Sequence, residues 1–361
     1  MKKAADYIAV SAFFVIVIMF AAYTLVMGRH GSESEKADSS DIRHNVQTYV
    51  SSNFPLSSNW KSLRTTMFVM TGKKNFDNIY ILKNRLVEIT DFDKDRLDKN
   101  ISQINEFSEN TDTPVYVMLA PTAAGIYSAK LPAYTSNTDQ REMIDNIYYD
   151  IDTIDTFFPM YSARNNYVYY RTDRKWTSFG AYFAYADGIK ELGFEPVVLS
   201  NYDQEYTSNS YYGGLYSELC YNSIGADRVN IFRSKYKTTV DSVELYREDQ
   251  VLTSKSVYFR SALKTADKTA IFLQGDNFTK ATVKTTAEDA PKLLIIKGSY
   301  ANTLVPFLTP HYSEITLVDP DKLKEEGKTL SDVADTSAYD QILFMYDCDQ
   351  FADETNFDLL K

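Results

Sequence analysis

Apolar residues along this chain follow two alternating patterns, short continuous runs and spacings of three or four residues. The run Val115–Ala120 is continuously apolar, which is typical of a strand buried on both faces in a parallel sheet. Between residues 95 and 109 the apolar positions, from Leu97 to Phe107, recur at helical spacing and leave a charged outer face. The same patterns predict further strands at residues 167–170, 293–296, 314–318 and 341–346, and further helices at residues 177–192 and 300–308.

Strands that alternate with helices predict an α/β domain with a mostly parallel sheet flanked by helices. Two segments depart from this alternation. Residues 72–90 predict a hairpin, with strands at 79–82 and 85–89. From about residue 200 to residue 285 the pattern changes to short strands rich in Tyr, Ser and Thr, which we interpret as an inserted β-rich region.

The most apolar stretch lies near the N-terminus. Residues 7–27 carry no charge, and at about 1.5 Å per residue this length crosses a hydrocarbon layer of about 30 Å. Lys2 and Lys3 precede it, so the positive-inside rule predicts a cytoplasmic N-terminus and an extracellular domain. A cleaved signal peptide is the alternative, although its apolar region is normally about 7–15 residues long. We therefore expect a single-pass protein of the cell membrane.

The segment after this apolar stretch has the composition of a linker. Residues 30–41 are rich in Ser, Glu and Asp and nearly free of large apolar side chains, so burial cannot offset the entropy cost of ordering them. We expect a cytoplasmic tail at residues 1–6, a membrane helix at 7–27, a flexible stalk at 28–44 and one extracytoplasmic domain at 45–361.

Composition narrows the possible functions. The 38 Lys and Arg against 49 Asp and Glu give a formal charge of −11, which repels phosphate backbones, so no nucleic-acid partner is expected. Three His and two Cys make a metal site hard to build, and we expect neither a metal nor another cofactor. Whether Cys220 and Cys348 pair stays open. The 28 Tyr residues suit a sugar-binding surface, with Tyr212 as one candidate, or a tyrosine-rich core.

Polar residues follow two predicted strands at the positions where ligands bind in open α/β sheets. Residues 170–177 and 297–300 each connect a predicted strand to a predicted helix. On the second turn Ser299 is presented as a nucleophile, and backbone N–H groups at Ser299 and Tyr300 are placed to receive an oxyanion. A serine helix cap behind Gly298 is the simpler interpretation of that turn alone.

The two turns together carry a family resemblance. An Asp-X-X-Trp-Thr-X-X-Gly-Ala tract begins at Asp173, and a strand–Gly-Ser-Tyr-Ala-Asn–helix tract has its glycine at Gly298. In this order they resemble the bacterial DHHW family, which is similar to the SGNH-type proteins of alginate O-acetylation. The resemblance extends from about residue 45 to residue 348 and implies a permuted SGNH-hydrolase-like fold. Further tracts that agree lie at residues 49–56, 78–80, 119–122, 130–132, 273–277, 306–312 and 318–319.

The resemblance also implies roles for single residues. In the family, Asp and the second His of Asp-His-His-Trp act as orienter and base, and a serine is the nucleophile. Carried over, the orienter is Asp173 and the nucleophile is Ser299, but the base position holds Lys175. A serine nucleophile needs a base with a pKa near working pH, and the pKa of lysine starts near 10.4, against about 6.5 for histidine. His311 lies roughly a dozen residues after Ser299, which favours a helix cap over a base.

Three further positions also depart from the family pattern. Arg174 replaces the first His, Gly298 replaces an Asp, and Asp321 stands where an Arg commonly follows the next strand. We interpret the set as a degenerate catalytic motif. Candidate ligand contacts around it are Trp176, Arg174, Lys297, Tyr212 and Tyr346.

The function implied by the resemblance is a role in cell-surface polysaccharide O-acetylation, beside a membrane-bound O-acyltransferase-type partner. With a degenerate motif the chain is expected to bind glycan or to act as a scaffold. The alternative is an active O-acetyltransferase or acetylesterase with Ser299 as nucleophile and Lys175 as base. A structural envelope protein without a ligand is the third hypothesis.

Overall fold

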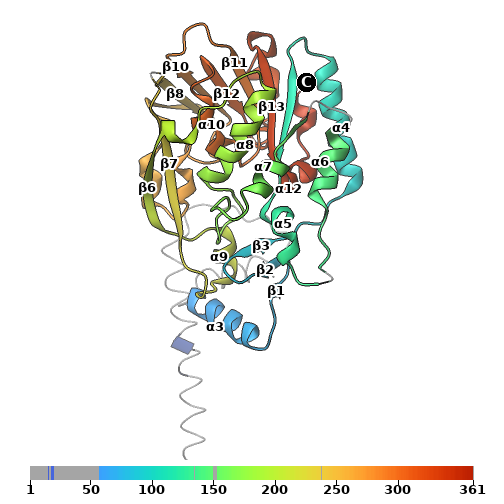
Figure 1. Cartoon of the computed structure of the whole chain (residues 1–361), viewed down its shortest axis with the longest axis vertical. Coiled ribbons are helices and arrows are strands. Elements are labelled where there is room, and N and C mark those ends of the chain that lie inside the picture. Colours follow the sequence, from blue (N-terminus) through green and yellow to red (C-terminus); the bar gives the residue numbers. More distant parts are fainter. Residues whose placement is uncertain are drawn as a thin grey trace, which may run out of the picture. The chain divides into compact units, whose positions relative to one another are not determined.

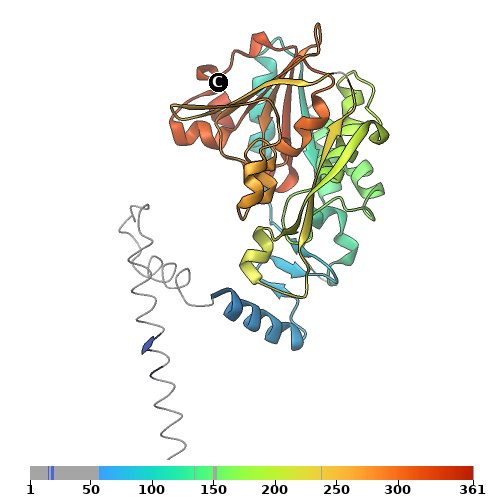
Figure 2. The same cartoon turned by 90° about the vertical axis from the view of Figure 1, so that its left-hand side faces the viewer.

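The computed structural model describes residues 57–133, 135–148, 153–236 and 238–360, together with Val15, Ile18 and Met19 (Figures 1 and 2). The predicted stalk and nearly all of the predicted membrane segment lie outside the described residues. Within the described part, no helix has both the length and the apolar character needed to cross a membrane. The chain divides into two compact units, one ending at Lys73 and including Leu219–Asn222, the other containing the remaining residues.

The larger unit is built on an eight-stranded sheet with the order β5-β4-β13-β11-β12-β10-β8-β9. The first five strands in this order are parallel and the last three pair antiparallel, so the predicted mostly parallel α/β sheet is confirmed. The strands are β4 (Val115–Ala120), β5 (Thr153–Asp155), β8 (Val240–Arg247), β9 (Gln250–Ser254), β10 (Lys280–Thr285), β11 (Lys292–Lys297), β12 (Glu314–Val318) and β13 (Gln341–Asp347).

Helices cover both faces of this sheet because the side chains of its central strands are apolar on both sides. In β11, Ile295 packs into one core and its neighbour Ile296 into the other. Figure 1 shows α8 and α10 in front of the strands and α4 and α6 beside them. The first core contains α5 (Ala123–Ile126), α7 (Phe157–Ser162), α8 (Ser178–Glu191) and α10 (Ala301–Leu308); the second contains α4 (Lys94–Glu109), α6 (Gln140–Tyr148), α11 (Pro320–Glu326), α12 (Cys348–Asp353) and the 3-10 turn η7 (Phe357–Leu360).

The segment interpreted as a β-rich insertion belongs only in part to a separate structure. Strands β6 (Tyr202–Tyr211) and β7 (Asp227–Ser234) pair with each other. In contrast, β8, β9 and β10 extend the main sheet, because alternate residues such as Val243 and Val283 are buried in the same core as the parallel strands. Short elements connect these strands: η2 (Leu199–Asn201), α9 (Gly214–Leu219), η3 (Arg260–Lys264) and η4 (Lys268–Ile271).

The predicted hairpin is present within a three-stranded sheet formed by β1 (Asn75–Phe76), β2 (Ile79–Ile81) and β3 (Leu86–Glu88). The predicted strand at residues 167–170 is wrong. Only a single bridge joins Tyr169 to Trp176. The Tyr169 ring is fully buried, and its hydroxyl donates to the Pro121 carbonyl. That bridge closes the loop at residues 170–176. The remaining elements are α3 (Ser57–Met70), η1 (Ser128–Lys130), η5 (Leu330–Asp332) and η6 (Thr336–Ala338).

Cys348 is a fully buried free thiol, so the Cys220–Cys348 disulfide considered above is not formed. Burial raises the pKa of the Cys348 thiol well above its ordinary value, which keeps this side chain protonated. Cys348 therefore acts as a small apolar residue in the core.

His311 follows α10 and packs against the rings of Tyr185 and Phe194. The Tyr185 hydroxyl accepts from the Val197 N–H and lies 2.7 Å from His311 Nε2, so it can donate its proton only to a neutral imidazole. Burial lowers the pKa of His311 to about 4. This histidine is therefore a partly buried structural residue, neutral at pH 7.

His311 predicts a measurable loss of stability in acid. Its pKa is depressed in the folded chain, so the stabilisation is complete above the unfolded value near 6.5 and is lost as pH falls towards 4. Between pH 7 and pH 5 the wild type should lose between about 1 and 2 kcal/mol more than His311→Gln, after allowance for partial exposure. Urea unfolding at both pH values measures the difference, and equal losses in the two proteins would contradict the prediction.

Candidate functional site

The carboxyl ends of β11 and β13 form a crevice at which the chain reverses its direction across the sheet. From β11 the chain continues through α10 to β12 on one side, and then through α11 to β13 on the other side. Ligands bind at such switch points in open α/β sheets. Ser299 follows β11 at this point, and Asp347 ends β13 beside it. The position of Ser299 is thus the one that the fold favours for a functional residue.

Ser299 lies half-buried between two clefts. Its backbone N–H donates to Gln350 Oε1 at 2.8 Å, so one of the two N–H groups expected to bind an oxyanion is already engaged. One cleft, of about 470 Å³, is lined by Asp276, Lys297, Asp319, Asp321, Lys322, Lys324, Glu325, Gln350, Thr355 and Asn356. The other, of about 360 Å³, contains the acidic side chains Glu88, Asp173, Asp347, Asp349 and Asp353.

Gly298 is packed too closely for any side chain. A Cβ atom built there would lie 2.7 Å from Gln350 Oε1 and 2.9 Å from Tyr346 Cδ1. The aspartate that precedes the serine in the family pattern therefore has no room in this chain. Gln350 occupies that space and binds the Ser299 N–H from it.

The loop at residues 170–176 is held by its own aspartate. Asp173 accepts from the Lys175 N–H at 2.9 Å, the Tyr211 hydroxyl at 2.7 Å and the Gly214 N–H at 2.8 Å. A Cβ at Gly213 would lie 2.1 Å from Asp173 Oδ2, so glycine is required there. Asp173 thus orients the loop backbone, and the contacts it makes do not include the Lys175 amine.

The amine of Lys175 belongs to a chain of alternating charges. Lys175 Nζ lies 3.1 Å from Asp276 Oδ2, and Lys297 Nζ lies 2.9 Å from Asp276 Oδ1. Lys297 Nζ also lies 2.8 Å from Asp319 Oδ2. The Lys297 side chain is only 1% exposed and lies over the Phe278 ring at 5.1 Å. Both lysines near the Ser299 turn are therefore ion-paired.

These pairs keep both amines charged. Burial alone would lower the pKa of Lys297, but the charges of Asp276 and Asp319 outweigh it and raise the pKa above its ordinary value. For Lys175, burial likewise lowers the pKa, and Asp276 with other aspartates outweighs it. In Asp276, burial opposes ionisation, but the two lysines hold its pKa well below the usual range. At neutral pH neither lysine is available as a base.

The other candidates from the DHHW-like tracts have structural contacts. Arg174 pairs with Glu88 through two guanidinium nitrogens and with Glu218 at 2.8 Å. Trp176 is buried, and its indole N–H donates to the Tyr300 carbonyl at 3.1 Å. The Tyr300 hydroxyl in turn donates to the Arg174 carbonyl at 2.6 Å. Trp176 and Tyr300 therefore fasten the two turns together.

The two tyrosines proposed as ligand contacts differ in position. Tyr346 is fully buried among Phe351 and Phe357, so its ring does not reach a ligand. Its strand is buried on both faces, which the apolar run 341–346 itself predicts. Tyr212 is exposed, and its ring packs at a tilt against Tyr216 with centroids 4.2 Å apart. A sugar-binding role for Tyr212 stays a prediction.

Sequence reasoning missed three residues that define this site. Asp276 forms an ion pair with each lysine, Asp347 lies beside the serine, and Gln350 binds its backbone. Burial, the largest effect, raises the pKa of Asp347 to about 6, and smaller hydrogen-bond contributions, including one from the Ser299 side chain, oppose that rise. Asp276 lies in one of the tracts that agree with the family, which is the only signal that pointed to it. Asp347 follows the apolar run 341–346 just as Ser299 follows the apolar run 293–296. This shared position after a buried strand is a sequence signal that could have identified Asp347.

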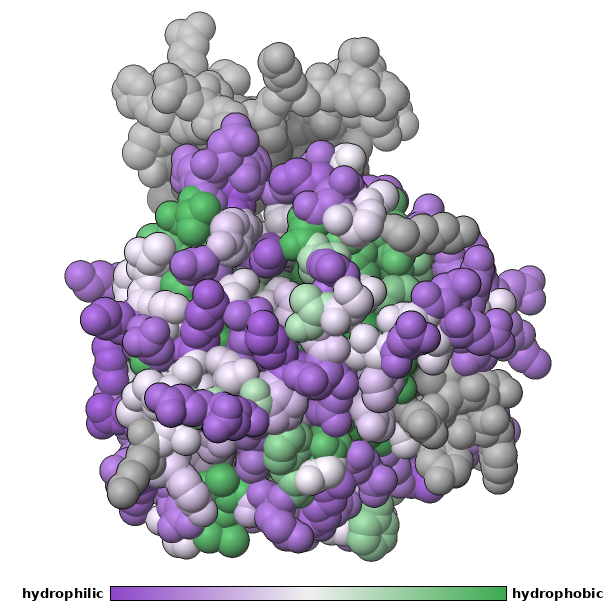
Figure 3. Space-filling model, turned by 90° about the horizontal axis from the view of Figure 1, so that it is seen from above, coloured by the Kyte–Doolittle hydropathy of each residue, from purple (hydrophilic) through white to green (hydrophobic). Residues whose placement is uncertain are grey.

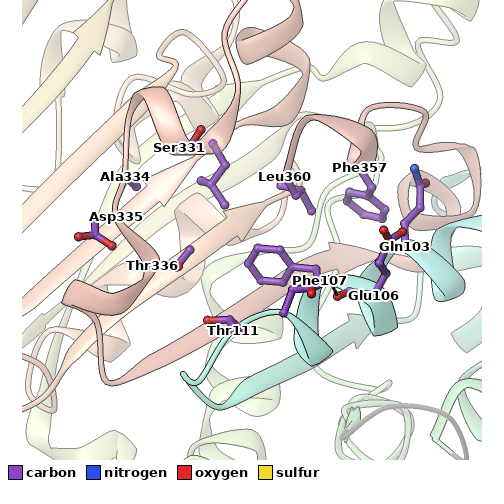
Figure 4. A pocket seen from close by; sticks show the side chains of 12 residues that line it. Gln103, Glu106, Phe107, Thr111, Ser331, Ala334, Asp335, Thr336, Phe357 and Leu360 are labelled. Atoms are coloured by element: carbon purple, nitrogen blue, oxygen red, sulfur yellow. Dashed lines mark hydrogen bonds between the residues drawn. The ribbon is translucent and has the colours of Figure 1, made fainter.

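A larger cavity, of about 610 Å³, lies away from Ser299, between α4, the turns η5 and η6, and η7 (Figure 4). The rings of Phe107 and Phe357 and the side chain of Leu360 form its apolar floor. Asp335 on one side and Glu106 on the other contribute its charged groups. This cavity shares no lining residue with the two clefts at Ser299.

Comparisons with known proteins agree with the resemblance in the sequence. The profile of a family described as DHHW protein matches residues 57–318. The structure is similar to that of a DHHW family protein from Eubacterium siraeum, with a TM-score of 0.62 and 22% identity over 78% of this chain and 93% of the other. It is also similar to Bacillus cereus PatB1 with a sulfonyl adduct, with a TM-score of 0.64 and 16% identity over 80% and 99% of the two chains.

A weaker likeness, with a TM-score of 0.47 and 12% identity, is to the O-acetyltransferase domain of Pseudomonas putida AlgJ, over 79% of this chain and 95% of that one. A likeness of this degree says nothing about function, and those above show the fold alone. A comparison with curated proteins gives no match.

Proposed function

The chain belongs to the DHHW family, and we propose that it is a glycan-binding member whose serine site no longer catalyses acyl transfer. The observation that carries the proposal is the chain of ion pairs from Lys175 through Asp276 to Lys297. A lysine with a pKa above 10.5 is unprotonated in fewer than about one molecule in a thousand at pH 7, so Ser299 has no amine base.

The clefts at Ser299 suit a ligand with many hydroxyl groups. Carboxylates accept hydrogen bonds from hydroxyls, and the amides of Gln350 and Asn356 both donate and accept them. We therefore propose a polysaccharide as the partner of these clefts. The setting that we propose, at the cell surface behind a membrane anchor at residues 7–27 and beside a membrane-bound O-acyltransferase-type partner, follows from the family resemblance.

The proposal is tested by ester hydrolysis and by glycan binding. A chromogenic acetyl ester should be hydrolysed at the same background rate by the wild type and by Ser299→Ala. A rate that depends on Ser299 would overturn the inactive assignment.

Binding to a glycan array should identify a polysaccharide ligand. Gln350→Ala removes an amide that lines both clefts, and it should weaken binding about tenfold, as expected for the loss of one good hydrogen bond. Gln103→Ala is the control, because Gln103 lines the cavity between α4 and η5 instead. An array without any ligand would favour a purely structural role.

One observation favours a second candidate function. The carboxyl group of Asp347, with a pKa of about 6, lies beside the Ser299 side chain and titrates close to neutral pH. A serine–carboxylate pair would then supply the base that Lys175 does not. In that case the rate lost in Ser299→Ala is also lost in Asp347→Asn, and the wild-type rate rises as pH increases through about 6.

A further inference from the structure

Helix α3 packs its polar side against Leu219–Asn222 of the same compact unit, and its apolar side is exposed. Ser62 and Thr65 are its buried residues. The Thr65 hydroxyl donates to the Leu219 carbonyl at 2.8 Å, and the Asn222 amide donates to the Ser62 hydroxyl at 2.9 Å. A surface helix of a globular protein normally has the opposite arrangement, with an apolar stripe facing the core.

The outer side of α3 carries one continuous apolar stripe. Trp60, Leu63, Met67 and Met70 follow one another at spacings of three, four and three residues, which places them on one side of a helix. Their exposed fractions are 49%, 51%, 59% and 83%. On the face of the molecule shown in Figure 3, by contrast, apolar residues form small separate areas among polar ones. An exposed apolar stripe of this kind is typical of a surface that contacts a membrane or another molecule.

The charge around this stripe is positive although the chain as a whole is acidic. Residues 57–73 contain Lys61, Arg64 and Lys73 and no Asp or Glu, in a chain with a formal charge of −11. Arg64 and Lys73 lie 5.7 and 5.4 Å from the centre of the Phe68 ring, so cations flank the apolar side chains. Basic residues beside an apolar stripe with a tryptophan are typical of helices that lie on anionic membranes.

We propose that α3 lies on the surface of an anionic lipid bilayer, with Trp60, Leu63 and Met67 in the boundary between headgroups and acyl chains. The position of α3 in the sequence agrees with this. Only residues 28–56 separate it from the predicted membrane segment, and a chain of that length reaches at most about 100 Å. Lys61 and Arg64 would then contact the lipid phosphates. This proposal is independent of whether Ser299 is catalytic.

The chain contains its own reporter for this contact. Its 2 Trp residues are Trp60, which is half-exposed, and Trp176, which is 1% exposed in the core. The full chain is reconstituted into phosphatidylcholine vesicles with or without phosphatidylglycerol, and with lipids brominated in the upper acyl chain. We expect bromine to quench the fluorescence of the wild type by about half in vesicles with phosphatidylglycerol and less without it. Trp60→Phe should abolish the quenching.

Matched variants separate the contribution of the apolar stripe from that of the basic residues. Leu63→Ser should reduce the quenching about twofold or more, whereas Leu252→Ser, at a position with similar exposure on β9, should leave it unchanged. Lys61→Glu with Arg64→Glu should remove the dependence on phosphatidylglycerol. The control is Lys284→Glu with Lys292→Glu, which changes the net charge by the same amount at exposed sites in the main sheet. This control should keep the dependence on phosphatidylglycerol.

Two outcomes would overturn the proposal. If Trp60 is quenched by acrylamide and not by brominated lipid, α3 faces water. If Trp60 is protected from acrylamide and also from brominated lipid, a protein covers the stripe, either a second copy of this chain or another partner. Cross-linking at Met70→Cys would then identify that protein.

Discussion

Lys297→Met should destabilise the folded chain by about 3–5 kcal/mol, the cost of breaking a buried ion pair by removing one partner. The methionine fills most of the same volume, so the loss comes from charge and not from a cavity. Asp319, whose side chain is 9% exposed, would keep a negative charge with no cation beside it. Thermal or urea unfolding of the purified protein measures the effect.

The control for this prediction is Lys322→Met. Lys322 pairs with Glu325 at 2.7 Å on the surface of α11, so its loss should cost less than about 1 kcal/mol. Adding Asp319→Asn should recover part of the stability. A deficit as small as that of Lys322→Met would show that the buried pair is not the source of stability.

Lys175→His should create ester hydrolysis that depends on Ser299. The substitution removes an amine that Asp276 holds protonated and supplies an imidazole with an ordinary pKa near 6.5, at the position where the family has its base. General-base catalysis contributes about 10²–10⁴-fold, and we expect about 10²-fold over the wild type because the Ser299 N–H is still bound to Gln350. The rate should rise with pH through at least about 6.5, since Asp276 raises the imidazole pKa.

Lys175→Met is the matched control for this gain. It breaks the same ion pair with Asp276 without adding a base, so its rate should equal that of the wild type. Ser299→Ala in the Lys175→His background should return the rate to background. If Lys175→His and Lys175→Met hydrolyse the ester at equal rates, the lack of a base is not the reason that this site is inactive.

Most of the sheet was predictable because its central strands are continuous apolar runs between helical spacings. The strands at 293–296 and 341–346 are observed as β11 and β13 with one or two more residues. The prediction failed at residues 167–170, where the tyrosines pack as a loop around a single bridge. It also separated β8 and β10 from the sheet, because the partner of an antiparallel strand depends on contacts distant in sequence and not on local pattern.

The candidate site was predictable only to the level of its two turns. The residues at 173 and 299 follow from the tracts, and the structure brings their turns together through Trp176 and Tyr300. The partners that decide the chemistry come from elsewhere in the chain. Asp276 lies on a loop before β10 and Gln350 lies in α12, and no local pattern links either to a lysine or a serine. Likewise, Tyr346 was predicted as a ligand contact, but burial on both faces of β13 removes it from the surface.

The packing at Gly298 also imposes an order on sequence change. A methyl group there would collide with Gln350 and with the Tyr346 ring, so no larger residue is tolerated while both keep their places. Positions in contact are not additive, and a library of single substitutions in this chain would score position 298 as intolerant. An acidic residue before Ser299 therefore becomes accessible only after positions 350 and 346 have made room. A path of substitutions from this chain to the full family pattern therefore requires the Gln350 side chain and the Tyr346 ring to move or to be replaced.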